Sequence, residues 1–166
     1  MFLNRLSTDN QERFLQLAGM LCYADGKYTN NERQMMRLYA AEVGEKVGAP
    51  IIEKVETDEA RHNQEGEKYF QLAYRFRSII EEVKDKSDMK ERKMILFELM
   101  GLAHADKSFS ENERKLITDS VEALEFNEDM LTRLNDRGHY FNIHEVEDML
   151  TRYVELQKEM TRYVLE

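Results

Sequence analysis

The sequence predicts an all-α fold, a duplicated helical bundle of about seven to eight helices. Apolar residues recur at helical spacing through most of the chain, a single proline interrupts its 166 residues, and a segment beginning at Ala24 recurs at Ala105. Apolar positions three and four residues apart place one face of each helix on a shared core. A chain of this length buries roughly 70 % of the surface it exposes when unfolded, so stability requires no metal or disulfide. We therefore expect one domain over residues 1–166, with related halves at about 1–86 and 87–166.

The first half is expected to begin with two helices that border a short corner. The first runs from about Thr8 to Ala24 and is apolar over a wide face, which indicates a central position in the core. Its positions at helical spacing are Phe14, Leu17, Ala18, Leu21 and Cys22. The second helix starts after Thr29 and ends at Gly44, where a glycine often ends a helix. Cys22 is the single cysteine, and we interpret it as a packed free thiol.

Two further helices are expected before the midpoint of the chain. Gly48-Ala49-Pro50 is predicted to be a loop, because glycine and proline commonly mark turns. A weak helix should follow from Ile51 to about Asn63, and a longer one should end near residues 84–87.

The second half is expected to repeat this plan from an N-cap at Asp88. The helix that follows is apolar nearly all round between residues 94 and 105, so it is predicted to be the other central helix. Glu91 and Glu98 share one face of it, and we interpret them as an exposed stripe. The next helix is expected to start after Ser110.

Two more helices are expected over residues 127–138 and from Asn142 onward. The last has apolar residues at alternating spacings of three and four, which form a heptad-like seam. The seam consists of Val146, Met149, Tyr153, Leu156, Met160 and Tyr163. We expect it to pack on its own bundle, and a homodimer through this C-terminal helix is the alternative.

An internal repeat with an offset of about 81 residues is the most informative feature. ADGKYTNNER at residues 24–33 aligns with ADKSFSENER at residues 105–114. Helix capping explains part of this match but not the Ala-Asp start or the shared aromatic position, so duplication is the better interpretation. Gly19 and Gly101 stand inside the two central helices, and we predict that they mark a close contact between them.

Each copy of the repeat contains the spacing of a capping box. Thr29 stands three residues before Glu32, and Ser110 stands three residues before Glu113. In such a box the hydroxyl and the carboxylate satisfy backbone amides that lack partners at the start of a helix. Capping alone would therefore account for both glutamates.

Asp25 and Asp106 need a further explanation. Each falls in the last turn of a predicted helix, where the macrodipole disfavours a carboxylate by roughly 0.3–1 kcal/mol. Amides of the following loop can compensate by donating to the aspartate in an Asx-type turn. A divalent cation shared with Glu32 and Glu113 is the functional alternative.

The loop resembles part of an EF-hand, but that type of site is excluded. Positions one and three of a calcium loop would fall on Leu21 and Tyr23 in the first copy, and on Leu102 and His104 in the second. None of these residues supplies a carboxylate. Any ion site must therefore take oxygens from different corners or from water, with modest affinity.

Enzyme motifs are incomplete in this sequence. Glu59-x-x-His62 is half of a di-iron motif, which needs a second copy that is absent. His144-Glu145 begins a zinc protease motif, but position 148 holds an aspartate where the second histidine belongs. We therefore expect no enzymatic activity.

The charge of the chain narrows the classes of partner. A formal net charge of −9 repels the phosphate backbone, so nucleic acid is not expected as a partner. It favours cations or a basic protein surface. Residues 1–6 are too short and polar for a secretory segment, and no apolar run reaches membrane-spanning length. We expect a cytoplasmic protein.

The repeated corner, with its Ala-Asp-Gly start and its glutamate, resembles the TerB-like family of tellurite resistance proteins. The resemblance is clearest over residues 14–43 and 95–124. It implies an all-helical duplicated fold, no catalysis and a divalent-cation site, with calcium, magnesium or zinc at the matching positions. Those positions are Asp25, Glu32, Asp106 and Glu113. Lys107 replaces the glycine in the second copy, and its ammonium group weakens that half of the site.

The resemblance also implies a function. We expect a non-enzymatic module that acts as a stress-associated adaptor and binds a cation through its acidic loops. The alternative is a plain interaction scaffold with an acidic surface and no metal.

Overall fold

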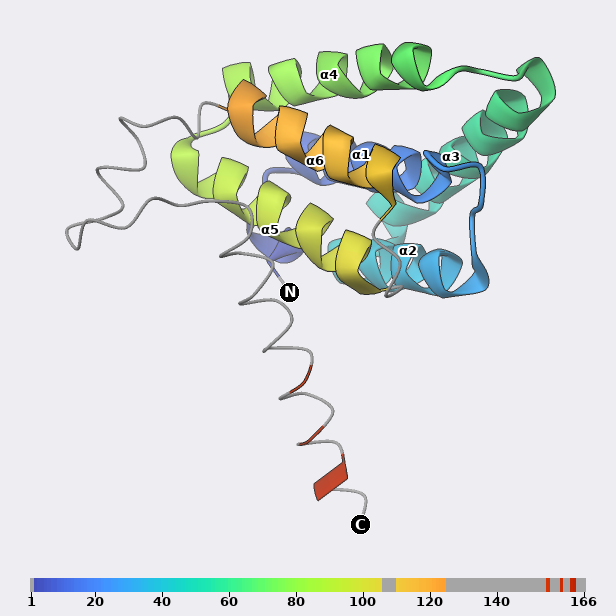
Figure 1. Ribbon diagram of the computed structural model, residues 1–166. Helices are drawn as coiled ribbons and strands as arrows, with labels where there is room; N and C mark the ends of the chain where they lie inside the picture. The colour runs from blue at the N-terminus through green and yellow to red at the C-terminus, as the bar shows by residue number, and fades with distance from the viewer. Residues whose placement is uncertain (1, 106–109, 125–154, 156–158, 160–161, 164–166) are drawn as a thin grey trace.

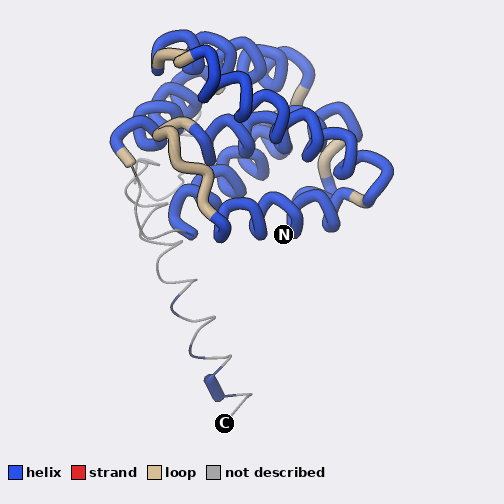
Figure 2. The backbone as a smooth tube through the Cα atoms, turned by 90° about the vertical axis from the view of Figure 1, so that its right-hand side faces the viewer, coloured by secondary structure: helices blue, strands red, loops and turns tan. Residues whose placement is uncertain are grey.

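The computed structural model describes residues 2–105 and 110–124, together with residues 155, 159, 162 and 163. This part contains a short 3-10 helix and six α-helices, and it has no strand (Figure 2). The elements are η1 (Leu3–Arg5), α1 (Thr8–Tyr23), α2 (Asn30–Val43), α3 (Glu45–Glu65), α4 (Tyr69–Lys86), α5 (Met89–Ala105) and α6 (Glu111–Ala123). The all-α prediction is confirmed for these residues. The helices predicted after residue 125, with the seam of the last one, fall almost entirely outside them.

Helix α1 is the centre of the fold and packs against each of the other five α-helices (Figure 1). Its apolar face is completely buried at Phe14, Leu17 and Ala18, and Cys22 is a thiol outside any disulfide that is only 1 % exposed. The predicted central position of this helix and the packed thiol are therefore confirmed. None of the described helices combines the length and the apolar character needed to cross a membrane.

The predicted loop at Gly48-Ala49-Pro50 is wrong, because these residues belong to α3. The helix begins directly after Gly44, whose φ of +97° ends α2. Gly48 is buried against α2, and a Cβ atom there would lie 2.5 Å from the carbonyl oxygen of Ala40. The glycine thus allows two helices to approach closely. Packing along α1 and α2 stabilises α3 by more than the one backbone bond that Pro50 costs.

The predicted contact between Gly19 and Gly101 is also wrong. A Cβ atom at Gly19 would lie 2.4 Å from a methyl group of Val55, so this glycine admits α3 to the surface of α1. A Cβ atom at Gly101 would meet no described atom within 4 Å. The two glycines stand in corresponding helices, one position apart in the register of the repeat, and their packing differs.

Backbone amides of the N-terminal segment donate hydrogen bonds to carboxylates of the bundle. The amide of Phe2 donates to Glu98 at 2.7 Å, and the amide of Ser7 donates to Glu91 at 2.8 Å. Glu98 is only 6 % exposed, so its interpretation as part of an exposed stripe is wrong. Helix α5 is covered on that side by the N-terminal segment, a long-range contact that helical periodicity does not reveal.

Candidate functional site

Both copies of the repeated corner form the predicted capping box. In the first, the backbone N–H of Thr29 donates to Glu32 at 2.7 Å, and the N–H of Glu32 donates to the Thr29 hydroxyl at 3.3 Å. In the second, the same bonds join Ser110 and Glu113 at 2.7 and 3.2 Å. Both glutamates are buried. Each is thus held in place by the start of its own helix.

Asp25 forms the predicted Asx-type turn. Its Oδ1 accepts the backbone N–H of Lys27 at 2.9 Å, across Gly26 with a φ of +78°. The side chain is otherwise exposed to solvent. This turn supplies the compensation that a carboxylate at a helix C-terminus requires.

The two corners meet in space, although some 80 residues separate them in sequence. The side-chain amide of Asn112, at the start of α6, donates to the carbonyl oxygen of Ala24, which follows α1, at 3.3 Å. Asp106 lies outside the described residues. Within the described part, no three acidic, histidine or cysteine side chains lie close enough together to hold a metal ion. The structure therefore joins the corners without itself supplying a complete set of ligands.

A second candidate site, which the sequence did not predict, lies between α3 and α4. These helices leave the turn at Gly66 in diverging directions, with α1 between them (Figure 1). A hollow of about 720 Å³ opens there, lined from both helices and from the turn. We call this space the α3–α4 cleft.

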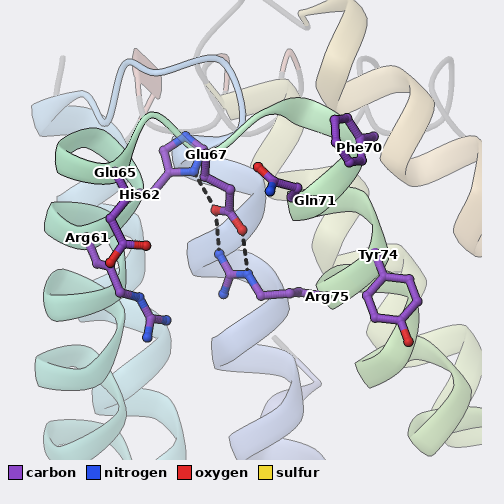
Figure 3. A pocket seen from close by; sticks show the side chains of 8 residues that line it. All are labelled: Arg61, His62, Glu65, Glu67, Phe70, Gln71, Tyr74 and Arg75. Carbon is purple, nitrogen blue, oxygen red and sulfur yellow. Dashed lines mark hydrogen bonds and ion pairs between the residues drawn. The ribbon is translucent and has the colours of Figure 1, made fainter.

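A polar network crosses the α3–α4 cleft (Figure 3). Arg75 of α4 donates through two nitrogens to the two oxygens of Glu67, both at 2.7 Å. His62 of α3 places Nδ1 at 2.6 Å from the same carboxylate, so Nδ1 is the donor. Arg75 also reaches the hydroxyl of Tyr23 at 3.5 Å. One carboxylate thus connects α3 and α4, and through Arg75 both are linked to α1.

The charges of this network are mutually stabilising. The bonds from Arg75 lower the pKa of Glu67 below its usual range, against a smaller opposing effect of burial. The bond to Glu67 raises the pKa of Arg75. Burial raises the pKa of Tyr23, whose hydroxyl stays protonated. Perturbed groups that line a cleft are a recognised sign of a functional site.

The cleft continues past its two arginines. A second hollow of about 370 Å³ lies on the α1 side, and Arg61 and Arg75 line both spaces. Lys54 and Asp58 of α3 complete the charged lining of the second hollow. Arg61 is paired with Asp58 at 2.9 Å.

A third hollow of about 600 Å³ lies on the opposite side of α3, against α2. Its lining includes Glu45, Glu53 and Glu56 with one arginine, Arg37, and otherwise consists of alanines and an isoleucine. We call it the α2–α3 groove. Its charged residues are mostly acidic.

Comparison with protein families matches residues 23–136 to the family described as tellurite resistance protein TerB. The chain belongs to the TerB family. The matched region includes both repeated corners and the α3–α4 cleft of this TerB domain. Neither the curated proteins nor the solved structures give a match.

The TerB match covers all four predicted acidic positions, of which the structure describes Asp25, Glu32 and Glu113. The residues of the α3–α4 cleft were missed. The sequence motif pairs His62 with Glu59, but in the structure Glu59 accepts from Arg33 at 3.0 and 3.2 Å, and His62 pairs with Glu67. One sequence pattern could have indicated this cleft. His62 and Glu67 flank Gly66, and Arg75 follows about two helical turns later.

Proposed function

We propose that this TerB domain is a non-enzymatic adaptor that acts in a stress response. The match to the TerB family across both corners carries the proposal. The hydrogen bonds of three glutamates also support it, because they stabilise the fold. Glu32 and Glu113 cap helices, and Glu67 joins α3 to α4. An adaptor needs a stable surface, and these bonds provide one.

The partner that we propose for the adaptor is a basic protein surface. The chain has a net charge of −9, and the α2–α3 groove concentrates three glutamates around a floor of small side chains. Complementary charge steers association and selects partners. The adaptor therefore presents an acidic, shallow groove to a basic segment.

Affinity capture from the source cell tests this function. Wild-type chain should retain a basic protein that the variant Glu45→Gln/Glu53→Gln/Glu56→Gln does not retain. The matched control removes three exposed acids elsewhere, as Asp85→Asn/Asp119→Asn/Glu122→Gln, and should capture like wild type. Equal loss in both variants would show that general charge, and not the groove, holds the partner.

A divalent cation at the joined corners is the second part of the proposal. The bond between Asn112 and Ala24 favours it, because that contact brings the acidic loops of both halves to one junction. Asp25 is exposed there, while Glu32 and Glu113 each use an oxygen in their caps. Asp106 has to complete the ligand set. Oxygen-only ligands suit calcium or magnesium better than zinc.

Thermal melting separates capping from coordination. Asparagine still forms an Asx turn and glutamine still closes a capping box, so Asp25→Asn/Glu32→Gln should melt like wild type in chelator. Millimolar calcium or magnesium should raise the Tm of wild type and leave the double variant nearly unchanged, at fixed ionic strength. Without such a shift in wild type, the alternative holds, a plain interaction scaffold with an acidic surface and no metal.

A further inference from the structure

The inner part of the α3–α4 cleft has a charge opposite to that of the whole chain. Lys54, Arg61 and Arg75 line the 370 Å³ hollow, and Asp58 is the one acidic residue among the described residues of its lining. Charges more than about 8–10 Å away are largely screened at physiological salt. Asp58 and Glu67, which pair with Arg61 and Arg75, offset two of these three positive charges. An approaching group therefore meets a small positive excess, although the chain as a whole is acidic.

The cations of this hollow keep donors that the fold does not use. Arg75 gives Nε and one Nη to Glu67, and Arg61 gives one Nη to Asp58. In the described part of the chain, neither arginine has a bond through its other Nη, and Lys54 has no hydrogen bond or ion pair. Figure 3 shows Arg75 extending from α4 toward α3, the helix that carries Arg61. Guanidinium groups bind carboxylates strongly because their donors match the two oxygens.

Aromatic side chains border the outer part of the cleft. Phe70 and Tyr74 lie one turn apart on α4 and are 66 % and 78 % exposed. Both line the 720 Å³ hollow that meets the cationic hollow at Arg61 and Arg75. Two adjoining hollows of these volumes exceed what a free anion fills. An extended peptide, in contrast, places a charged and an apolar side chain in them at once.

We propose that the α3–α4 cleft binds an acidic peptide segment of a partner protein. A carboxylate of the segment lies between Arg61 and Arg75, within reach of Lys54, and a neighbouring apolar or aromatic side chain packs on Phe70 and Tyr74. This site is separate from the acidic α2–α3 groove and takes a segment of the opposite charge. The domain thus has two binding surfaces of different chemistry.

Fluorescence anisotropy on the full chain tests the proposal. The probes are a labelled eight-residue peptide with two glutamates beside a phenylalanine, and the same peptide with lysines in place of the glutamates. The glutamate peptide should bind, and Arg61→Gln should weaken it about tenfold, the usual cost of one charged hydrogen bond. Arg77→Gln is the matched control, since Arg77 lies on α4 outside the lining of the cleft and pairs at the surface with Glu81.

Further variants distinguish loss of peptide binding from loss of folding, and the α3–α4 cleft from the α2–α3 groove. Lys54→Gln should weaken binding in the same direction as Arg61→Gln, which guards against a folding defect in either one. Phe70→Ala should also weaken binding, and the Gln variant of the α2–α3 groove should bind normally, so the two proposals fail separately. Equal affinity of Arg61→Gln and Arg77→Gln, or equal binding of the lysine peptide, overturns the proposal. So does displacement by millimolar inorganic phosphate with no effect of Phe70→Ala, which would indicate a site for small anions.

Discussion

Glu67 lies in the short turn between α3, which Gly66 caps, and α4, which begins at Tyr69. Its carboxylate accepts from Arg75 on one side and from His62 on the other. Removing it would leave the Arg75 guanidinium without its main partner. Leaving a charged group unsatisfied costs more than a neutral hydrogen bond contributes. This residue therefore determines how α3 and α4 are held relative to α1.

The lowered pKa of Glu67 predicts a pH-dependent contribution to stability. A carboxyl whose pKa is lower in the folded state stabilises the fold above its unfolded value of about 4.3, and this stabilisation is lost as the pH falls through the folded value. Glu67→Gln should reduce the free energy of unfolding by about 1–3 kcal/mol at pH 7. Urea denaturation at pH 7 and pH 3 should show the difference from wild type shrinking in acid. A difference of equal size at both pH values would contradict the lowered pKa.

At the scale of the elements, α3 is formed by its packing more than by its own sequence. It contains two residues that commonly end helices, Gly48 and Pro50, inside its first two turns. It nevertheless runs without interruption because Gly48 fits against Ala40 of α2 and Val55 fits against Gly19 of α1. Glycines at both contacts allow the backbones to approach where any larger side chain would separate them.

Gly19→Ala tests the α1–α3 contact. The added Cβ would lie 2.4 Å from Val55, a β-branched side chain with little rotamer freedom, so we expect a loss of about 1–3 kcal/mol in the free energy of unfolding. Truncating the neighbour, in Gly19→Ala/Val55→Ala, should recover part of that loss in a double-mutant cycle.

Gly101→Ala is the matched control for this contact. It makes the same change in the equivalent helix of the second half, where no described atom lies within 4 Å. Since alanine favours a helix over glycine, stability should stay equal or rise by up to about 1 kcal/mol. A large loss in the free energy of unfolding of Gly101→Ala would contradict this, because it would indicate a close neighbour at Gly101.

At the scale of the whole molecule, charge decides which partners can approach. The chain has a net charge of −9. The three cations of the α3–α4 cleft change the charge only locally and leave the molecule as a whole acidic. Binding of duplex DNA depends on neutralising many phosphates with lysine and arginine. The cations of the α3–α4 cleft do not form an extended basic surface, because Glu65 and Glu67 line the same cleft.

The chain should therefore not bind random duplex DNA at about 0.15 M salt. Anisotropy of a labelled duplex gives the measurement, and the labelled glutamate peptide serves as a positive control for the protein preparation. Submicromolar affinity for the duplex would reveal a basic surface outside the described residues.

The sequence by itself determined the local structure of this TerB domain. Helix α1, the end of α2 at Gly44, the cap at Asp88, both capping boxes and the turn at Asp25 were predicted correctly. The physical reason is range: helix periodicity and capping depend on residues within about four positions of one another, and the sequence displays these directly. The duplication, the seam of the last helix and the cation site remain predictions.

Only the tertiary structure decided which distant residues meet. Glu98 appeared exposed by its helical position, but the N-terminal segment covers it. Gly48 and Pro50 signalled a loop, but packing on α1 and α2 kept them in a helix. The α3–α4 cleft exists because α1 separates two helices that are adjacent in sequence, so residues 61–75 meet residues 16–23. Contacts across such separations follow from the packing of whole helices, and no local pattern in the sequence specifies them.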